Sequence, residues 1–218
     1  MKTKLVALAL VSGLVGSVSG QVLVTWDGIN GASIPGSSFD SSITAGDLTR
    51  GAGLNQAPGG NFNSNNWSPS TTDFASAVLE GDYIVFSFSV ALGDQVTDLS
   101  VRAEIDTTGS GPQTLAWAID TGSGFSQIGP SFDGPDPGTI ITADTVGGPL
   151  TGSVDLAIVG WGASEDTGRM DIEDDLIGDS VGIEVSGTVS AVPEPNLYGA
   201  LAGIIALGFA AVRRRRQS

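Results

Sequence analysis

Carboxylates are the main side chains of this sequence that could do chemistry. The chain has 24 Asp and Glu residues but no histidine and no cysteine. Without imidazole and thiol groups, a Ser-His-Asp triad, a cysteine nucleophile and a Cys/His zinc site are all excluded. The carboxylates still allow acid–base catalysis by a carboxylate pair, and any metal site would need oxygen ligands, which favours calcium.

Two Asp-Thr-Gly triplets, at Asp120 and Asp166, could supply a carboxylate pair. The first follows Ala-Trp-Ala-Ile at 116–119 and precedes a serine, so it resembles the motif of pepsin-like proteases. That resemblance implies two aspartates that share a proton and activate water. Residues 163–165, Ala-Ser-Glu, do not give Asp166 a buried strand. The alternative is two turns in which Asp accepts backbone hydrogen bonds and Gly takes a positive φ.

A second group of carboxylates is crowded between residues 171 and 179. Within it, Asp171, Glu173, Asp174 and Asp175 are candidate calcium ligands, because Ca²⁺ takes several carboxylate oxygens. The spacing does not fit an EF-hand loop, whose glycine and final glutamate would be out of place. A solvated acidic loop without an ion is the alternative, and no other cofactor is predicted.

Four tryptophans could stack on sugar rings. Trp117 shares the apolar face of its strand, so we expect it in the core. Trp67 lies in a segment rich in Gly, Asn and Ser, and Trp161 has strand parity opposite to Leu156 and Ile158. Trp67 and Trp161 are therefore the candidates for sugar contact. Burial of both indoles is the alternative.

The distribution of charge limits the partners. Six of the nine basic residues and one of the 24 acidic residues lie in residues 1–20 and 193–218. The segment 21–192 is left with three arginines and 23 acidic residues, a net charge of −20 and no lysine. Such a segment repels nucleic acid and anionic lipid. It attracts divalent cations, although solubility alone would also explain the charge.

Short apolar runs separated by Gly and Pro predict the strands that position these side chains. Period-two alternation, typical of half-buried antiparallel strands, appears at residues 83–90, 99–105, 115–119, 154–158 and 183–189, with a further strand at 22–26. Their apolar faces need a second layer, so we predict an all-β, two-sheet antiparallel β-sandwich or jelly roll. Residues 30–69, except for a short strand near Ile43, and residues 129–138 are predicted to be loops.

Both ends of the chain look like targeting segments. Residues 1–20 carry two lysines, an apolar stretch and small residues before Gln21, the order found in a secretory signal peptide. Residues 197–212 contain no charge and are followed by four arginines at 213–216. We predict a transmembrane helix there with its arginines in the cytoplasm, which places the acidic domain outside.

The tail resembles a known sorting signal. Pro193, Glu194 and Pro195 precede the apolar segment, and Arg213, Arg214, Arg215 and Arg216 follow it. This order resembles the PEP-CTERM sorting domain of exported bacterial proteins. The resemblance implies transient anchoring in the inner membrane and recognition by an exosortase-type enzyme, with Pro-Glu-Pro as the recognition signal. A plain C-terminal anchor is the alternative.

Together these features predict residues 1–20 as a signal peptide, 21–191 as one acidic β-sandwich domain and 192–218 as a sorting tail. The predicted function is that of a non-catalytic structural or adhesive protein of the cell surface or extracellular matrix, with no catalytic residues. The first alternative is a carbohydrate-binding module acting on extracellular polysaccharide. The second is an aspartic protease.

Overall fold

The computed structural model describes residues 20–27, 31–135, 139–146, 148–173 and 181–192. The predicted signal peptide, apart from Gly20, lies outside these residues, and so does the tail after Val192, including the Pro-Glu-Pro motif and the four arginines. Within the described ranges, no helix is both long and apolar enough to cross a membrane.

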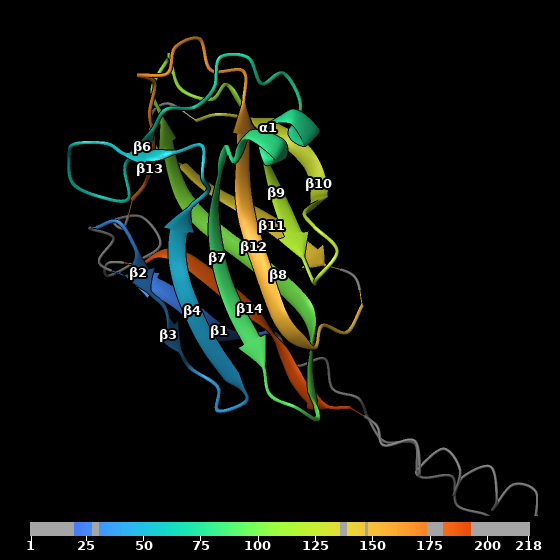
Figure 1. The fold of residues 1–218 in the computed structure, drawn as a ribbon. Helices are drawn as coiled ribbons and strands as arrows, with labels where there is room; N and C mark the ends of the chain where they lie inside the picture. Colours follow the sequence, from blue (N-terminus) through green and yellow to red (C-terminus); the bar gives the residue numbers. More distant parts are fainter. Residues whose placement is uncertain (1–19, 28–30, 136–138, 147, 174–180, 193–218) are drawn as a thin grey trace, which may run out of the picture.

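The described residues form two antiparallel sheets packed as a β-sandwich (Figure 1). The elements are β1 (Gln21–Asp27), β2 (Ile34–Pro35), β3 (Ser37–Ser38), β4 (Ile43–Arg50), β5 (Asn55–Gln56), β6 (Ser64–Asn65), α1 (Phe74–Glu80), β7 (Tyr83–Val90), β8 (Asp94–Thr107), β9 (Thr114–Asp120), β10 (Ser126–Asp133), β11 (Thr139–Val146), β12 (Gly152–Trp161), β13 (Met170–Ile172) and β14 (Val181–Ala191). The six-stranded sheet has the order β10-β9-β12-β7-β4-β2. The eight-stranded sheet has the order β3-β1-β14-β8-β13-β6-β5, and β11 also pairs with β8. The predicted two-sheet sandwich is confirmed.

The hydrophobic core lies between the sheets, and strand alternation places its side chains. Every second residue of β7 from Ile84 to Val90 is buried, as the period-two pattern predicted. The rings of Trp26 and Trp117 pack edge-on against Phe86, with centroid distances of 5.1 and 6.3 Å. Trp117 is therefore a core residue, in agreement with its predicted parity.

The strand predicted near Ile43 is present, and most of the described residues between 31 and 69 lie outside strands, but the segment holds more strand than predicted. β4 is an eight-residue strand that pairs with β7, and four two-residue strands occupy other parts of the segment. The register of β4 shifts between Ala45 and Leu48. This irregularity places the buried residues Ile43 and Leu48 an odd number of positions apart, which hides the alternation of the strand.

The predicted loop at residues 129–138 is wrong in its first half, because β10 continues to Asp133. β10 is the last strand of the six-stranded sheet, and its register shifts between Ile128 and Phe132. An irregular edge strand is one of the few places in a sheet that accept a proline such as Pro130. Gly129 and Pro130 are residue types typical of loops, which is why the sequence favours a loop here.

Helix α1 was not predicted. It has seven residues and begins after a capping box formed by Asp73 and Ser76. It ends at Gly81, whose φ of 82° is the left-handed conformation common after a helix. Only Ala77 is fully buried. So short a helix shows no apolar stripe in the sequence, and its two caps are the only local indication of it.

Candidate functional site

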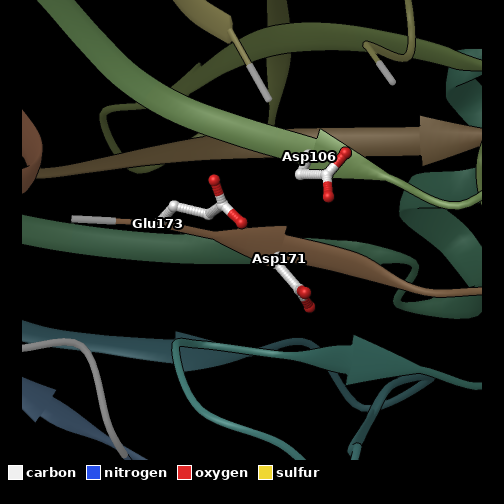
Figure 2. Close-up of side chains that lie close together, drawn as sticks. All are labelled: Asp106, Asp171 and Glu173. Carbon is white, nitrogen blue, oxygen red and sulfur yellow. The ribbon is translucent and has the colours of Figure 1, made fainter. Parts of the chain in front are cut away.

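Three carboxylates that two neighbouring strands of the eight-stranded sheet position lie close together (Figure 2). Asp106 comes from β8, Asp171 from β13, and Glu173 directly follows β13. Asp106 and Asp171 are partners in the antiparallel ladder. One carboxylate oxygen of each of the three residues lies within 4.8 Å of the other two. We call these three residues the carboxylate cluster.

Strand alternation turns the cluster away from the core. Met170 and Ile172, on either side of Asp171, are fully buried, and so is Ile105, the neighbour of Asp106. Because successive side chains of a strand point to opposite faces, the aspartates between them face outward. The packing of β8 and β13 on the core thus fixes where the carboxylates lie.

Asn63 lies beside the cluster. Phe62 and Ile172 exchange backbone hydrogen bonds at 3.2 and 3.5 Å, which places the next residue, Asn63, opposite Asp171 on the same face. Asn63 is only 5% exposed, and its Nδ2 donates to the carbonyl of Pro58 at 3.4 Å. Its Oδ1 is buried without a hydrogen bond, and so is Oδ1 of Asp171. Two acceptor oxygens without donors therefore lie on the same patch of the sheet.

Within the carboxylate cluster, the surroundings of Asp171 disfavour its negative charge. The pKa of Asp171 is raised from 3.8 to about 6, first by burial and then by the charges of Asp106 and Glu173. Arg169 and Arg50 act in the opposite direction, but their effect is smaller. The two guanidinium groups therefore do not offset the rise in the pKa of Asp171.

The side chain of Arg50 is held mainly by groups outside the carboxylate cluster. Its Nε donates to Ser64 Oγ and its Nη2 to the carbonyl of Asn63, both at 2.9 Å. The guanidinium also stacks on the ring of Phe62, 3.6 Å from the centroid. Burial lowers the pKa of Arg50 to about 10, against a smaller opposing effect of Asp171. Arg50 therefore anchors the strand ends more than it neutralises the cluster.

The geometry of the carboxylate cluster fits a hard cation. Calcium binds oxygen ligands at about 2.3–2.6 Å, so two of its ligands can be separated by up to about 5 Å. Separations within 4.8 Å allow one ion to contact all three carboxylates. The amide oxygen of Asn63 is of the ligand type that calcium also accepts. The cluster has no imidazole or thiolate, the ligands that zinc prefers.

The sequence identified part of this group. Asp171 and Glu173 were predicted as calcium ligands, and the structure places them together. Asp174 and Asp175 lie outside the described residues. Asp106 was missed because it lies far away in the sequence. Alternation in β8 puts it on the polar face, but only the pairing of β8 with β13 brings it to Asp171.

The predicted sugar contact by Trp67 is wrong. Trp67 is 0% exposed, and its Nε1 donates to the carbonyl of Ser64 at 3.1 Å. Its indole fills the core, where a large ring removes the most apolar surface from water. Trp161 does lie on the outer face of β12 and is partly exposed. It packs edge-on against Phe74 of α1, with ring centroids 6.5 Å apart.

The aspartic protease alternative is also wrong. Asp120 ends β9, whereas Asp166 follows Trp161, which pairs with Thr114 at the other end of β9. A seven-residue strand spans about 20 Å, so the two carboxyl groups cannot share a proton. Asp120 Oδ1 instead accepts the backbone N–H groups of residues 122–124 at 2.6, 2.8 and 2.9 Å.

The first Asp-Thr-Gly triplet is therefore the predicted turn. Partial burial raises the pKa of Asp120, but the three N–H donors outweigh it and the net pKa is lowered. Gly122 and Gly124 take φ values of 107° and 92°. At the second triplet, Gly168 N donates to the carbonyl of Glu165 at 3.1 Å, which also closes a turn.

Comparisons with known proteins give little further information. No protein-family model matches the chain, and no curated protein matches it. Among solved structures, a family 29 carbohydrate-binding module from Piromyces equi shares 12% identity at a TM-score of 0.40, covering 78% of this chain and 93% of that one. A mutant family 29 module complexed with cellulohexaose shares 13% identity at a TM-score of 0.42, covering 79% and 94%. Likeness at this level does not assign a function to the chain.

Proposed function

We propose that this chain is a non-catalytic, exported protein of the cell surface or extracellular matrix whose β-sandwich binds calcium at the carboxylate cluster. The observation that carries the calcium proposal is the approach of Asp106, Asp171 and Glu173 to within 4.8 Å of one another. The raised pKa of Asp171 supports it, because a bound cation would supply the positive charge that the two nearby arginines do not.

The proposed role of the ion is structural. The cluster joins the long strand β8 to the three-residue strand β13, and Asn63 lies next to the two-residue strand β6. Short strands contribute few ladder hydrogen bonds, so a shared ion would hold this corner of the sheet in register. Extracellular calcium-binding modules bind with Kd values of about 0.1–1 mM, which suits an exported domain.

Thermal unfolding of the full-length chain in detergent tests this proposal. At a Kd of about 0.1 mM, 1 mM calcium stabilises the folded state by about 1.4 kcal/mol relative to EDTA. For a domain of this size the gain raises Tm by about 3–6 °C. Magnesium should have a smaller effect, because it dehydrates reluctantly and demands octahedral geometry. Equal Tm values in EDTA and in calcium would eliminate the calcium proposal.

Export and sorting complete the proposal and rest on the two ends of the chain. In this proposal, residues 1–20 direct secretion. The tail then crosses the inner membrane transiently, and an exosortase-type enzyme recognises Pro193, Glu194 and Pro195. The support is the order of the Pro-Glu-Pro motif, the uncharged segment and the arginines in the sequence. The intact mass of the protein from its native host tests this part separately.

Carbohydrate binding is the second candidate function. Its support no longer comes from Trp67, whose indole is buried. It comes from the neighbours Asn66 and Ser68, which line a polar pocket together with Asp82. Side-chain amide, hydroxyl and carboxylate groups are the partners that sugar hydroxyls use. Calorimetric titration of the full-length chain with glucose and N-acetylglucosamine, in a sugar-free detergent, tests this candidate, and absence of binding by both sugars would count against it.

A further inference from the structure

Large apolar side chains are exposed at one end of the sandwich. Leu92 is fully exposed in the turn between β7 and β8, and Phe39 is 62% exposed in the turn between β3 and β4. Val192, which directly follows β14, is 38% exposed. Single exposed apolar residues are ordinary, whereas several that gather on one surface mark a site of contact with a protein or a membrane.

Backbone hydrogen bonds hold the three segments at the same end. Val192 N–H donates to the carbonyl of Gly93 at 2.8 Å, so the exit of β14 lies beside the turn between β7 and β8. Ala91 N–H donates to the carbonyl of Ser42 at 2.8 Å, which joins the same turn to the segment that enters β4. In Figure 1 this is the lower end of the sandwich, where β7 ends and β4 begins. We call the three exposed side chains the apolar end: Phe39, Leu92 and Val192.

The tail of the chain continues from this end. The uncharged segment that we expect to cross the membrane begins at Leu197, and only residues 193–196 separate it from Val192. An extended chain spans at most about 3.6 Å per residue, so Val192 lies within about 18 Å of the start of that segment. The opposite end of the sandwich is farther away, because the eight residues of β7 alone span about 25 Å.

The charge of this end indicates which lipid it can approach. Asp40 and Asp94 lie here, in the turn before β4 and at the start of β8. The three arginines of the described residues lie elsewhere: one in the middle of β8, one at the far end of β4 and one hydrogen-bonded beyond the far end of β8. Anionic lipid therefore repels this end, whereas zwitterionic headgroups do not.

A lipid bilayer fits the apolar end better than a second copy of the chain does. Phenylalanine and leucine are among the side chains that enter the boundary between headgroups and acyl chains. The tail would bring that boundary within reach of the apolar end. A second copy would bring another domain with a net charge of −20 to the same place, and the two would repel each other.

We propose that the apolar end rests on the surface of the bilayer while the tail is anchored, with Phe39, Leu92 and Val192 in the headgroup boundary. This contact would hold the Pro-Glu-Pro motif, which follows Val192, close to the membrane face. The inference rests on the export and sorting part of the proposed function, and it adds a lipid-binding surface of the domain itself. It depends neither on calcium nor on sugar binding.

Fluorescence quenching by lipid tests the proposal on the full-length chain in phosphatidylcholine vesicles. The chain has no cysteine, so Leu92→Cys, Phe39→Cys and Leu79→Cys each accept one bimane label. Leu79 is the matched control, since it is 85% exposed but lies on α1, at the opposite end of β7. With spin-labelled phosphatidylcholine in the vesicles, emission should fall about twofold or more at positions 92 and 39 and stay unchanged at 79.

A second variant separates apolar contact from tethering. Leu92→Asp, placed in the Phe39→Cys protein, should at least halve the quenching of the label at 39, because a carboxylate does not enter the headgroup boundary. Leu79→Asp in the same protein should leave the quenching unchanged. Both substitutions alter exposed side chains, so neither should change Tm.

The outcomes distinguish this inference from the sorting proposal. Protein that floats with the vesicles but is quenched equally at 92 and 79 would overturn the inference and leave the tail anchor standing. Protein that does not float would overturn both. Quenching at 39 that persists with Leu92→Asp would show that the tether alone brings this end close, and would overturn the contact. Labels shielded from aqueous iodide but not quenched by lipid would indicate that the tail or a second copy covers the apolar end, which would also overturn the proposal.

Discussion

Substitution of Asp171 by Asn separates the two roles of this carboxylate. In EDTA, Asp171 carries an unfavourable charge, since its pKa of about 6 lies roughly 2 units above the ordinary 3.8. At about 1.4 kcal/mol per unit, the cost at neutral pH has an upper limit of about 3 kcal/mol. The group is partly solvated, so screening reduces this to about 1–2 kcal/mol. Asp171→Asn should therefore stabilise the calcium-free protein by about 1–2 kcal/mol, or about 2–8 °C in Tm.

Calcium should reverse the order of the two proteins. At a Kd of about 0.1 mM, the wild-type protein gains about 1.4 kcal/mol in 1 mM calcium and about 2.7 kcal/mol in 10 mM. Asp171→Asn removes one of three charged ligands and should lose most of this gain. The two stability curves should then cross near 1 mM calcium. Thermal unfolding at pH 7 across a calcium titration measures the crossing directly.

Asp155→Asn is the matched control. The pKa of Asp155 is also raised, first by burial and then by Asp120, but the residue lies on β12 in the other sheet. Its substitution should stabilise the protein in EDTA and keep the full calcium gain. The reasoning is refuted if Asp171→Asn destabilises the protein in EDTA. It is also refuted if that variant gains as much from calcium as the control does.

Three further predictions concern the pH dependence of stability, a glycine substitution and the processing of the chain. In EDTA, the free energy of unfolding should rise as pH falls from about 6 to 4, because Asp171 takes up its proton in the folded state before it does so in the unfolded chain. In 10 mM calcium the trend should be the opposite, since protons displace the ion. Denaturant titrations measure both trends. Gly53→Ala should destabilise the protein by about 1–3 kcal/mol, because its Cβ would meet Asp82 Oδ1 at 2.6 Å. Gly109→Ala, where a Cβ meets nothing within 4 Å, should stay within about 0.5 kcal/mol in the same assay. Mass spectrometry of the native protein should find a species that lacks residues 1–20 and the residues after about 195; a mass that retains residues 197–218 would contradict sorting.

The sequence predicted the sandwich wherever strands are regular and half buried. In β7 every second residue from Ile84 to Val90 is apolar and buried, and the strand has the predicted bounds. The prediction from the sequence was incomplete where the pairing between strands is irregular. The register shift in β4 and the edge position of β10 remove the alternation or admit a proline, and neither effect can be read from local composition.

The candidate sites were harder to predict because long-range pairing assembles them. Asp171 and Glu173 are two residues apart, so their shared face follows from the strand period alone. Asp106 and Asn63 reach them only through the pairing of β8 and of the segment before β6 with β13. Asp82 shows the same limit, because its burial follows from helix α1 and from the loop that contains Ser68.

The composition of the domain explains why the carboxylate cluster favours a bound cation. Residues 21–192 hold 23 acidic residues and three arginines, and each arginine is already engaged. Arg102 pairs with Glu184 at 2.8 Å, Arg50 donates to Ser64 and to backbone carbonyls, and Arg169 donates to a backbone carbonyl. With so few arginines, a carboxylate that the fold buries is stabilised by hydrogen bonds, is protonated, or takes a positive charge from a bound cation. Where three oxygens converge, a small ion can provide that charge. A lysine-free acidic domain is therefore suited to binding a cation where its carboxylates converge.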